Sequence, residues 1–197
     1  QGGARLNLNF VVAERLEFGG REMGNGEFVG ARMTGSAFRG SHMQCANLFG
    51  ADLTDADLSG VDLERADLRG AMLRRCNLEG ANLQEADIRD GFIMRRDAQG
   101  NYSYCNAGSG AAEFEDARMT GVDLSSAKLA RVFAPRTDLS RANMRNVNLR
   151  EADLSGSDLS GVNLSGADLT AANLSHCILR GAVLSGALFD RTNLDGA

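Results

Sequence analysis

Aliphatic residues recur at every fifth position over most of the chain, as in the stretch ADLTDADLSGVDLERADLRGAML at residues 51–73. An α-helix repeats its faces every 3.6 residues and a strand every two, so a sustained period of five belongs to neither element. The pattern therefore predicts a coil built of short turns.

Each group of five residues, or pentad, has positions of distinct chemistry around its aliphatic residue, which we call the centre. The centres run from Leu8 to Ile93 and, offset by one residue, from Phe114 to Leu194, and only Ala13 is a weak centre in the first stretch. The residue two positions before the centre is usually small, the residue directly before it is often Asp or Asn, and glycine is common two positions after it.

The repeat fails once, at MRRDAQGN, residues 94–101. An excursion of about six residues would restore the phase, after which Tyr102 and Tyr104 would take the small and centre positions. Asp97 and Gly100 have turn-forming chemistry. The sequence thus predicts a projecting loop at 94–101, whose candidate contact residues are Arg95, Arg96, Asp97 and Asn101.

This spacing resembles the pentapeptide-repeat family, whose motif is A(D/N)LXX, over nearly the whole chain. The resemblance implies an all-β solenoid, a right-handed quadrilateral parallel β-helix with four pentads per coil, in which the centre and the small residue point inward. Physical reasoning agrees, because these two side chains would fill a narrow tube in layers, glycine would supply turns with positive φ, and Asp or Asn would bond nearby amides. Stacking at β spacing gives about nine coils and a rod roughly 43 Å long.

Four segments follow from this organisation: a cap or imperfect first coil at 1–20, a first repeat block at 21–93, the loop at 94–101, and a second block at 102–197. Arg21 and Gly26 depart from the small inward position near the start. At the other end TNLDGA stops in mid-repeat, and unpaired backbone groups there invite pairing. Either this end forms an end-to-end homodimer with a second copy, or the chain continues further.

Composition narrows the classes of function. The net charge of −5 comes from interspersed acids and bases, so we expect no direct binding of nucleic acid. Neither a signal peptide nor a run of 18 apolar residues is present, so we expect no membrane association and a cytoplasmic location, although a targeting segment before Gln1 could have been removed. The four cysteines lack C-x-x-C spacing and are interpreted as reduced thiols.

Catalytic chemistry is not expected, because a filled axis with flat walls offers no pocket for converging groups. His42 and His176 would lie roughly 30 Å apart and could not share a metal or a proton. Cys76 and Cys177 take the small inward position, where a thiol behaves as a small apolar group. Asn interleaved with Asp along the coil relieves like-charge repulsion and argues against a cation ladder. We therefore expect no enzyme activity, no metal and no cofactor.

A candidate partner contact emerges when the centres are assigned to four walls with about six loop residues left out. On that assignment the wall with Leu48, Leu68, Ile88, Phe114 and Ala134 is acidic and the next wall is basic. An outward aromatic and the chain's only proline lie beside the acids, which suggests a protein contact; the alternative is that VFAPRT is a tolerated bulge. The candidate residues are Asp87, Asp90, Glu113, Glu115, Asp116, Phe133, Pro135 and Arg136.

The function predicted from these features is that of a non-catalytic protein-binding or scaffold module, whose walls and loop dock an unidentified partner protein. The alternative is a DNA-mimicking inhibitor or protector of DNA gyrase or topoisomerase, because gyrase-directed members of the family are thought to mimic duplex DNA by a rod shape and a negative surface. This chain departs from them in its modest net charge, in the basic Arg95 and Arg96, and in lacking a C-terminal dimerisation segment.

Overall fold

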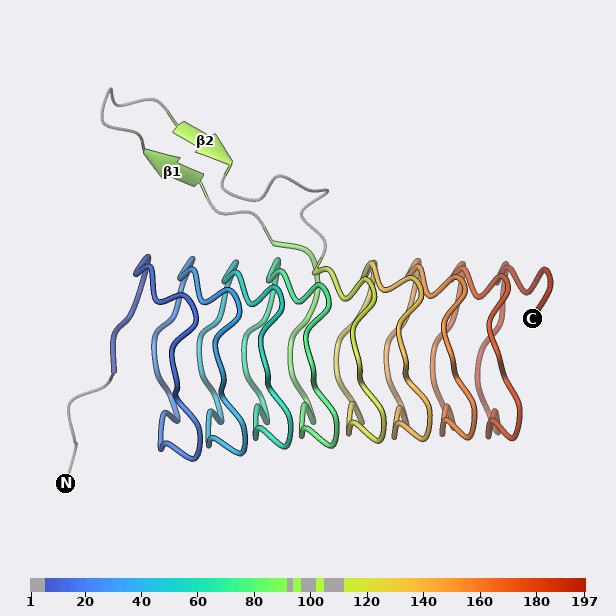
Figure 1. Cartoon of the computed structure of the whole chain (residues 1–197). Helices are drawn as coiled ribbons and strands as arrows, with labels where there is room; N and C mark the ends of the chain where they lie inside the picture. Colours follow the sequence, from blue (N-terminus) through green and yellow to red (C-terminus); the bar gives the residue numbers. More distant parts are fainter. Residues whose placement is uncertain (1–5, 92–93, 97–101, 105–111) are drawn as a thin grey trace.

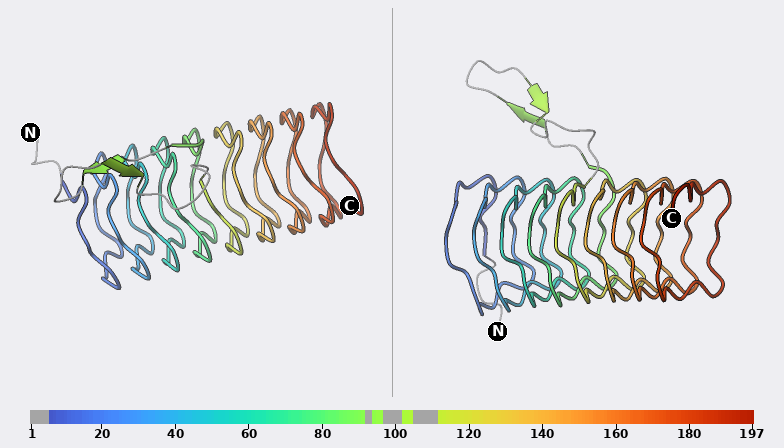
Figure 2. Two further views of the ribbon diagram at one scale, coloured as in Figure 1. Left: turned by 90° about the horizontal axis from the view of Figure 1, so that it is seen from above. Right: turned by 45° about the vertical axis from the view of Figure 1, so that its right-hand side comes forward.

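Residues 6–91, 94–96, 102–104 and 112–197 are described by the structure, a computed structural model of the chain. The chain winds into a stack of similar coils that form an elongated rod, with the first described coil at one end of the stack and the C-terminal coil at the other (Figures 1 and 2). Each pentad contributes one β-bridge residue, the one directly before the centre, and this residue pairs in parallel with the equivalent residue of the next coil. Asp57 pairs with Asn77, for example, and Asn148 pairs with Asp168.

The bridges form four ladders along the described residues, and each ladder defines one wall of the rod. Wall 1 runs from Asn7 to Leu188 and wall 2 from Val12 to Asn193. Wall 3 runs from Glu17 to Ile178, and wall 4 from Glu22 to Val183. A coil of four pentads is therefore four-sided, as the period of five predicted.

Backbone hydrogen bonds join each coil to the next at every pentad. The Leu58 N–H donates to the Asn77 carbonyl at 2.7 Å, the Gly60 N–H donates to Glu79 at 2.9 Å, and the Asn77 N–H donates back to Ala56 at 2.9 Å. The stack thus satisfies its peptide groups between neighbouring coils, although each pentad is too short to form an extended strand.

Most corners of the described coils are β-turns. The Val61 N–H donates to the Leu58 carbonyl at 3.1 Å, and Gly60 has a φ of 61°. A positive φ at the third residue alone is the geometry of a type II turn. Larger residues adopt the same conformation at other corners, as Arg65 does with a φ of 59°.

The core consists of the inward positions. Centres such as Leu63 and small residues such as Ala66 are fully buried. Where the small position holds a hydroxyl, it is satisfied by the neighbouring coil: Thr137 Oγ1 donates to the Phe114 carbonyl at 2.8 Å, and Ser157 Oγ donates to Ala134 at 3.0 Å. The inward assignment of both positions is confirmed for these coils.

The first coil starts early in the chain. Asn7, Val12 and Glu17 already form bridges to Glu27, Arg32 and Ala37, so much of the segment predicted as a cap or imperfect first coil is coil. Gly26, an exception in the small position, lies where a Cβ atom would come within 2.5 Å of the Phe28 ring. The missing side chain therefore makes room for a large centre in the same pentad.

The interruption differs from the prediction. Among the described residues, the next bridge residue after Asp87 outside the two short strands is Glu113, which joins the ladder of Met72. Two short strands lie between them, β1 (Met94–Arg96) and β2 (Tyr102–Tyr104), and they pair antiparallel with Arg95 opposite Ser103. Figure 1 shows this hairpin outside the stack.

The predicted placement of Tyr102 and Tyr104 in the coil is therefore wrong, because both belong to β2. The start of the second block at 102 is wrong for the same reason, and over the part of the chain that the structure describes the ladders resume at Glu113. Of the predicted loop residues, Arg95 and Arg96 lie in β1, whereas Asp97 and Asn101 lie outside the described residues.

Candidate partner-binding wall

Wall 2 carries a series of ion pairs on either side of the junction between the two repeat blocks. Arg75 pairs with Asp55 one coil earlier, with Nε to Oδ1 at 2.7 Å. Arg74 reaches across the junction to Glu113, with Nε to Oε2 at 2.6 Å, and only 8% of the Glu113 side chain is exposed. Neighbouring coils on this wall therefore present opposite charges to each other.

Arg136 continues this series on the next coil. Its guanidinium contacts Glu115 at 2.5 Å and Asp116 at 2.9 Å. The hydrogen bonds with Asp116 and then Glu115 raise the pKa of Arg136. The bond to Arg75 likewise lowers the pKa of Asp55. More than half of the Arg75 side chain and more than half of the Arg136 side chain remain exposed.

The first five residues of VFAPRT form a regular pentad and Thr137 begins the next one, so the alternative of a bulge is wrong. Phe133 bridges Glu113 on one side and Asp153 on the other, and its centre, Ala134, is buried. Pro135 is also buried, at the second position of the corner turn, where proline is favoured in type II turns. Phe133 is half-buried on the wall, so the outward aromatic of the prediction contributes only part of its ring surface.

The predicted acidic wall is wrong because it was built on the six-residue excursion. Asp87 lies on wall 1 next to Lys128, whereas Glu113 lies on wall 2 between Met72 and Phe133. On wall 1 Asp87 pairs with Arg89 at 2.6 Å, and Asp90 pairs with Arg131 at 3.3 Å. Of the eight candidates the structure brings together six, which are Glu113, Glu115, Asp116, Phe133, Pro135 and Arg136.

Side chains before the centres act as the sequence suggested. Asp52 Oδ1 accepts the Thr54 N–H at 3.0 Å, which is an Asx turn. Asn amides link neighbouring coils, since Asn82 Nδ2 donates to Asp62 at 3.0 Å and Asn173 Nδ2 donates to Asp153 at 3.2 Å. Where Asn follows Asp in the next coil, an amide–carboxylate hydrogen bond thus replaces the repulsion that two stacked carboxylates would have.

The other reactive side chains are accounted for by local contacts. His42 Nδ1 lies 3.0 Å from Glu22 on wall 4. Burial raises the pKa of the Cys76 thiol, and Cys177 Sγ donates to the Leu154 carbonyl at 3.0 Å.

The described part of the chain holds no group of three or more His, Cys, Asp or Glu side chains placed to bind a metal. Over the same residues, we find no helix with the length and apolar character needed to cross a membrane.

The sequence reasoning missed an apolar collar on the last coil. Ile178, Val183 and Leu188 take the outward bridge position on walls 3, 4 and 1 and are 53%, 45% and 57% exposed. Most pentads place Asp or Asn there. Three successive apolar replacements were therefore a readable signal.

The comparisons with known proteins agree with this architecture. A family model described as pentapeptide repeats (8 copies) matches residues 25–55, 51–90, 136–166 and 167–197. The chain belongs to the pentapeptide repeat family, whose members form a right-handed quadrilateral β-helix. A comparison with curated proteins finds no match.

Solved structures provide further likenesses. QnrB1, a plasmid-mediated fluoroquinolone resistance protein, is 20% identical, with 92% of this chain and 91% of that chain covered and a TM-score of 0.58, which supports a common fold. HetL, a pentapeptide repeat protein involved in heterocyst differentiation regulation from the cyanobacterium Nostoc sp. strain PCC 7120, is 25% identical, with coverage of 98% and 91% and a TM-score of 0.42. A pentapeptide repeat protein from the Arabidopsis thaliana thylakoid lumen is 32% identical, with coverage of 64% and 70% and a TM-score of 0.21.

Proposed function

We propose that this chain is a non-catalytic protein-binding module whose partner docks on wall 2 between Asp55 and Arg136. The observation that supports the proposal is the series of ion pairs at the junction, in which charges of opposite sign follow one another at the fixed spacing of the coils. Because the backbone ladders hold these groups, a partner with the opposite order of charges would meet a preformed surface, and charge complementarity of this kind favours specific association.

Reversing two exposed cations of this wall tests the proposal. The Arg75→Glu, Arg136→Glu double variant should fold, because neither guanidinium is buried, and should lose partners captured by cross-linking and mass spectrometry from cells that produce the protein. The matched control is Arg141→Glu, Arg145→Glu, which changes the charge equally on walls 3 and 4. The proposal would be contradicted if the wall 2 variant still captured the same partners, or if both variants lost them equally.

A second copy of the chain is the other candidate partner, and the apolar collar favours it. Exposed Ile178, Val183 and Leu188 surround the last coil, where the Leu194 centre is also 43% exposed. Large exposed apolar residues gathered in one region mark contact sites, so we propose end-to-end association there.

Restoring the usual residue of the repeat tests this contact. The variant Ile178→Asn, Val183→Asn, Leu188→Asn keeps the turn-forming chemistry and removes the apolar surface. Light scattering after gel filtration should show a concentration-dependent dimer for the natural sequence and a monomer for the variant. A monomer in both cases would rule out the contact.

DNA mimicry directed at gyrase is the weaker candidate, because arginines pair with four acids of wall 2 and interrupt its negative charge; these acids are Asp55, Glu113, Glu115 and Asp116. The fold that this chain shares with QnrB1 is not evidence that the chain also confers fluoroquinolone resistance. We expect no inhibition in a gyrase supercoiling assay at micromolar protein. Inhibition would restore this candidate.

A further inference from the structure

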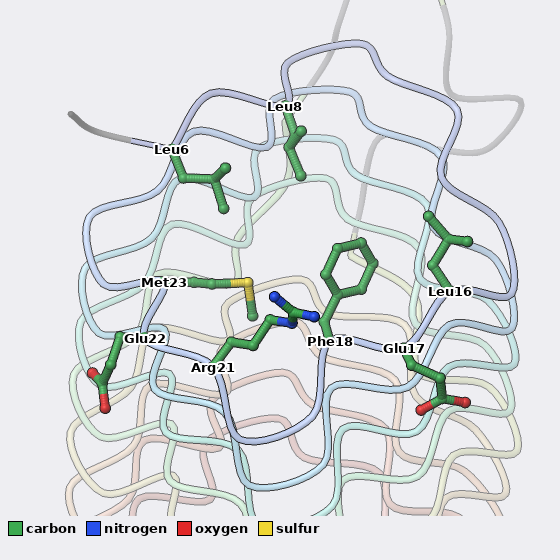
Figure 3. Close-up of a pocket in the computed structure, with 8 residues that line it drawn as sticks. All are labelled: Leu6, Leu8, Leu16, Glu17, Phe18, Arg21, Glu22 and Met23. Carbon is green, nitrogen blue, oxygen red and sulfur yellow. The ribbon is translucent and has the colours of Figure 1, made fainter.

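The first coil surrounds a cavity of about 680 Å³ at the N-terminal end of the stack (Figure 3). Its lining is mainly apolar and includes Leu6, Leu8, Phe18 and Met23. Phe18 stacks on Phe38 of the next coil, with ring centroids 4.9 Å apart and an interplanar angle of 8°. The cavity therefore has a floor of packed side chains and a volume typical of small-molecule sites.

Arg21 brings a single positive charge into this apolar mouth. It takes the position that small residues fill elsewhere, as Ser41 and Val61 do on the same wall. In Figure 3 its side chain extends inward between Met23 and Phe18. Across the described residues, no carboxylate lies within ion-pair distance of the Arg21 guanidinium.

The two acids at the rim do not neutralise this charge. Glu22 pairs with His42 at 3.0 Å on wall 4, and Figure 3 shows both Glu22 and Glu17 directed away from the interior. The cavity thus combines apolar walls with a guanidinium that has no carboxylate partner among the residues described, and its planar pair of N–H donors matches a carboxylate.

A second copy stacked on this end would not satisfy Arg21. The inward positions of the last coil are Ala182, Ala187 and Thr192 beside apolar centres, and none of them carries an acid. Closing the mouth with such a surface would bury the guanidinium without a partner, which is strongly unfavourable. An occupant must therefore supply both an anion and apolar surface.

We propose that the N-terminal mouth binds an aliphatic carboxylate, with the carboxylate on Arg21 and the hydrocarbon chain against Leu8, Phe18 and Met23. The ion pair fixes the head of the ligand, and burial of the chain provides the apolar contribution to affinity. This site is independent of wall 2 and of the collar, and it requires no chemical step.

Decanoate is the probe, with binding measured by isothermal calorimetry on the whole chain. The natural sequence should bind one decanoate, and Arg21→Gln should weaken binding at least tenfold. The matched control is Arg15→Gln, which removes an exposed arginine at an outer corner of the same coil and should leave the affinity unchanged. Decanol, which has the same chain without the charge, should bind the natural sequence at least tenfold more weakly than decanoate does.

Three results would overturn the proposal. One is the absence of decanoate binding, and another is equal binding by decanol or by the Arg21→Gln variant. The third is sedimentation evidence that Arg21→Gln promotes stacking of copies while decanoate has no effect, which would make Arg21 a guard against self-association. Thermal melting of each variant checks that the coil remains folded.

Discussion

Gly26 and Phe28 show how tightly single side chains are fitted to one another in the narrow interior. The Phe28 ring is fully buried and occupies the space in which a Cβ atom at position 26 would lie. The departure from the repeat at Gly26 is thus matched by the large centre two residues later, and both residues belong to one packing arrangement.

Gly26→Ala should therefore lower the free energy of unfolding by about 1 to 3 kcal/mol, the usual cost of overpacking a core. Chemical denaturation followed by circular dichroism measures this value. Gly24→Ala is the matched control, because an added Cβ there meets nothing closer than 3.6 Å. Adding Phe28→Leu to Gly26→Ala should recover part of the loss, and a loss that the smaller centre does not relieve would contradict the packing argument.

Residue-scale features were predicted unevenly from the sequence. The burial of centres such as Leu63 followed from the repeat, because the pattern itself reports which side chains face inward. The partner of Arg136 did not follow, since Glu115 and Asp116 become its neighbours only when the correct coils are stacked. Arg21 was recognised as an exception, but its cavity depends on the shape of the first coil.

The bridge ladders are the elements that make the outer surface specific. Asp123 on wall 4 illustrates their chemistry: its carboxylate accepts the Ser125 N–H at 2.9 Å, the Gln84 amide at 2.9 Å and the Asn143 amide at 3.1 Å. Partial burial by itself raises the pKa of Asp123, but these hydrogen bonds together outweigh it and lower the pKa below its usual value.

This lowered pKa predicts acid sensitivity. The unfolded chain takes up the proton near pH 3.9, so the stabilisation from Asp123 is complete above that value and is lost as the pH falls through the folded pKa. Asp123→Asn should therefore lower the melting temperature at pH 7. The variant should also lose less stability than the natural sequence does when the pH is lowered from 5 to 3.

Val122→Ala is the control for this prediction. It removes buried methyl groups next to Asp123 and should lower the melting temperature equally at every pH. If Asp123→Asn behaves in the same way as Val122→Ala, with a loss independent of pH, the hydrogen-bonded carboxylate is not the source of the acid sensitivity.

At the scale of the whole molecule, the four-sided stack could be predicted and the junction between its two blocks could not. Interruptions that differ by a whole number of pentads restore the same phase of the repeat, yet they place the following residues on different walls. The sequence therefore indicated the coil but assigned Glu113 to the wall of Asp87 instead of the wall of Met72. Only the spatial stacking distinguishes these registers, and it decides which charges meet.

The register at the junction consequently determines the candidate binding wall, because it brings Arg74 to Glu113 and sets the coil that carries Arg136. Paired cysteines test it most directly, because a disulfide forms only between residues whose Cα atoms lie within about 7 Å. The background replaces the four native cysteines, with Ala at the buried positions Cys76 and Cys177 and Ser at Cys45 and Cys105.

In that background Met72→Cys, Glu113→Cys should form an intramolecular disulfide on mild oxidation, detected by mass spectrometry of peptides from the folded protein. Asp87→Cys, Glu113→Cys, the pair that the six-residue excursion would bring together, should remain reduced under the same conditions. Cross-linking of 87 to 113 instead of 72 to 113 would contradict the register and with it the arrangement of charges on wall 2.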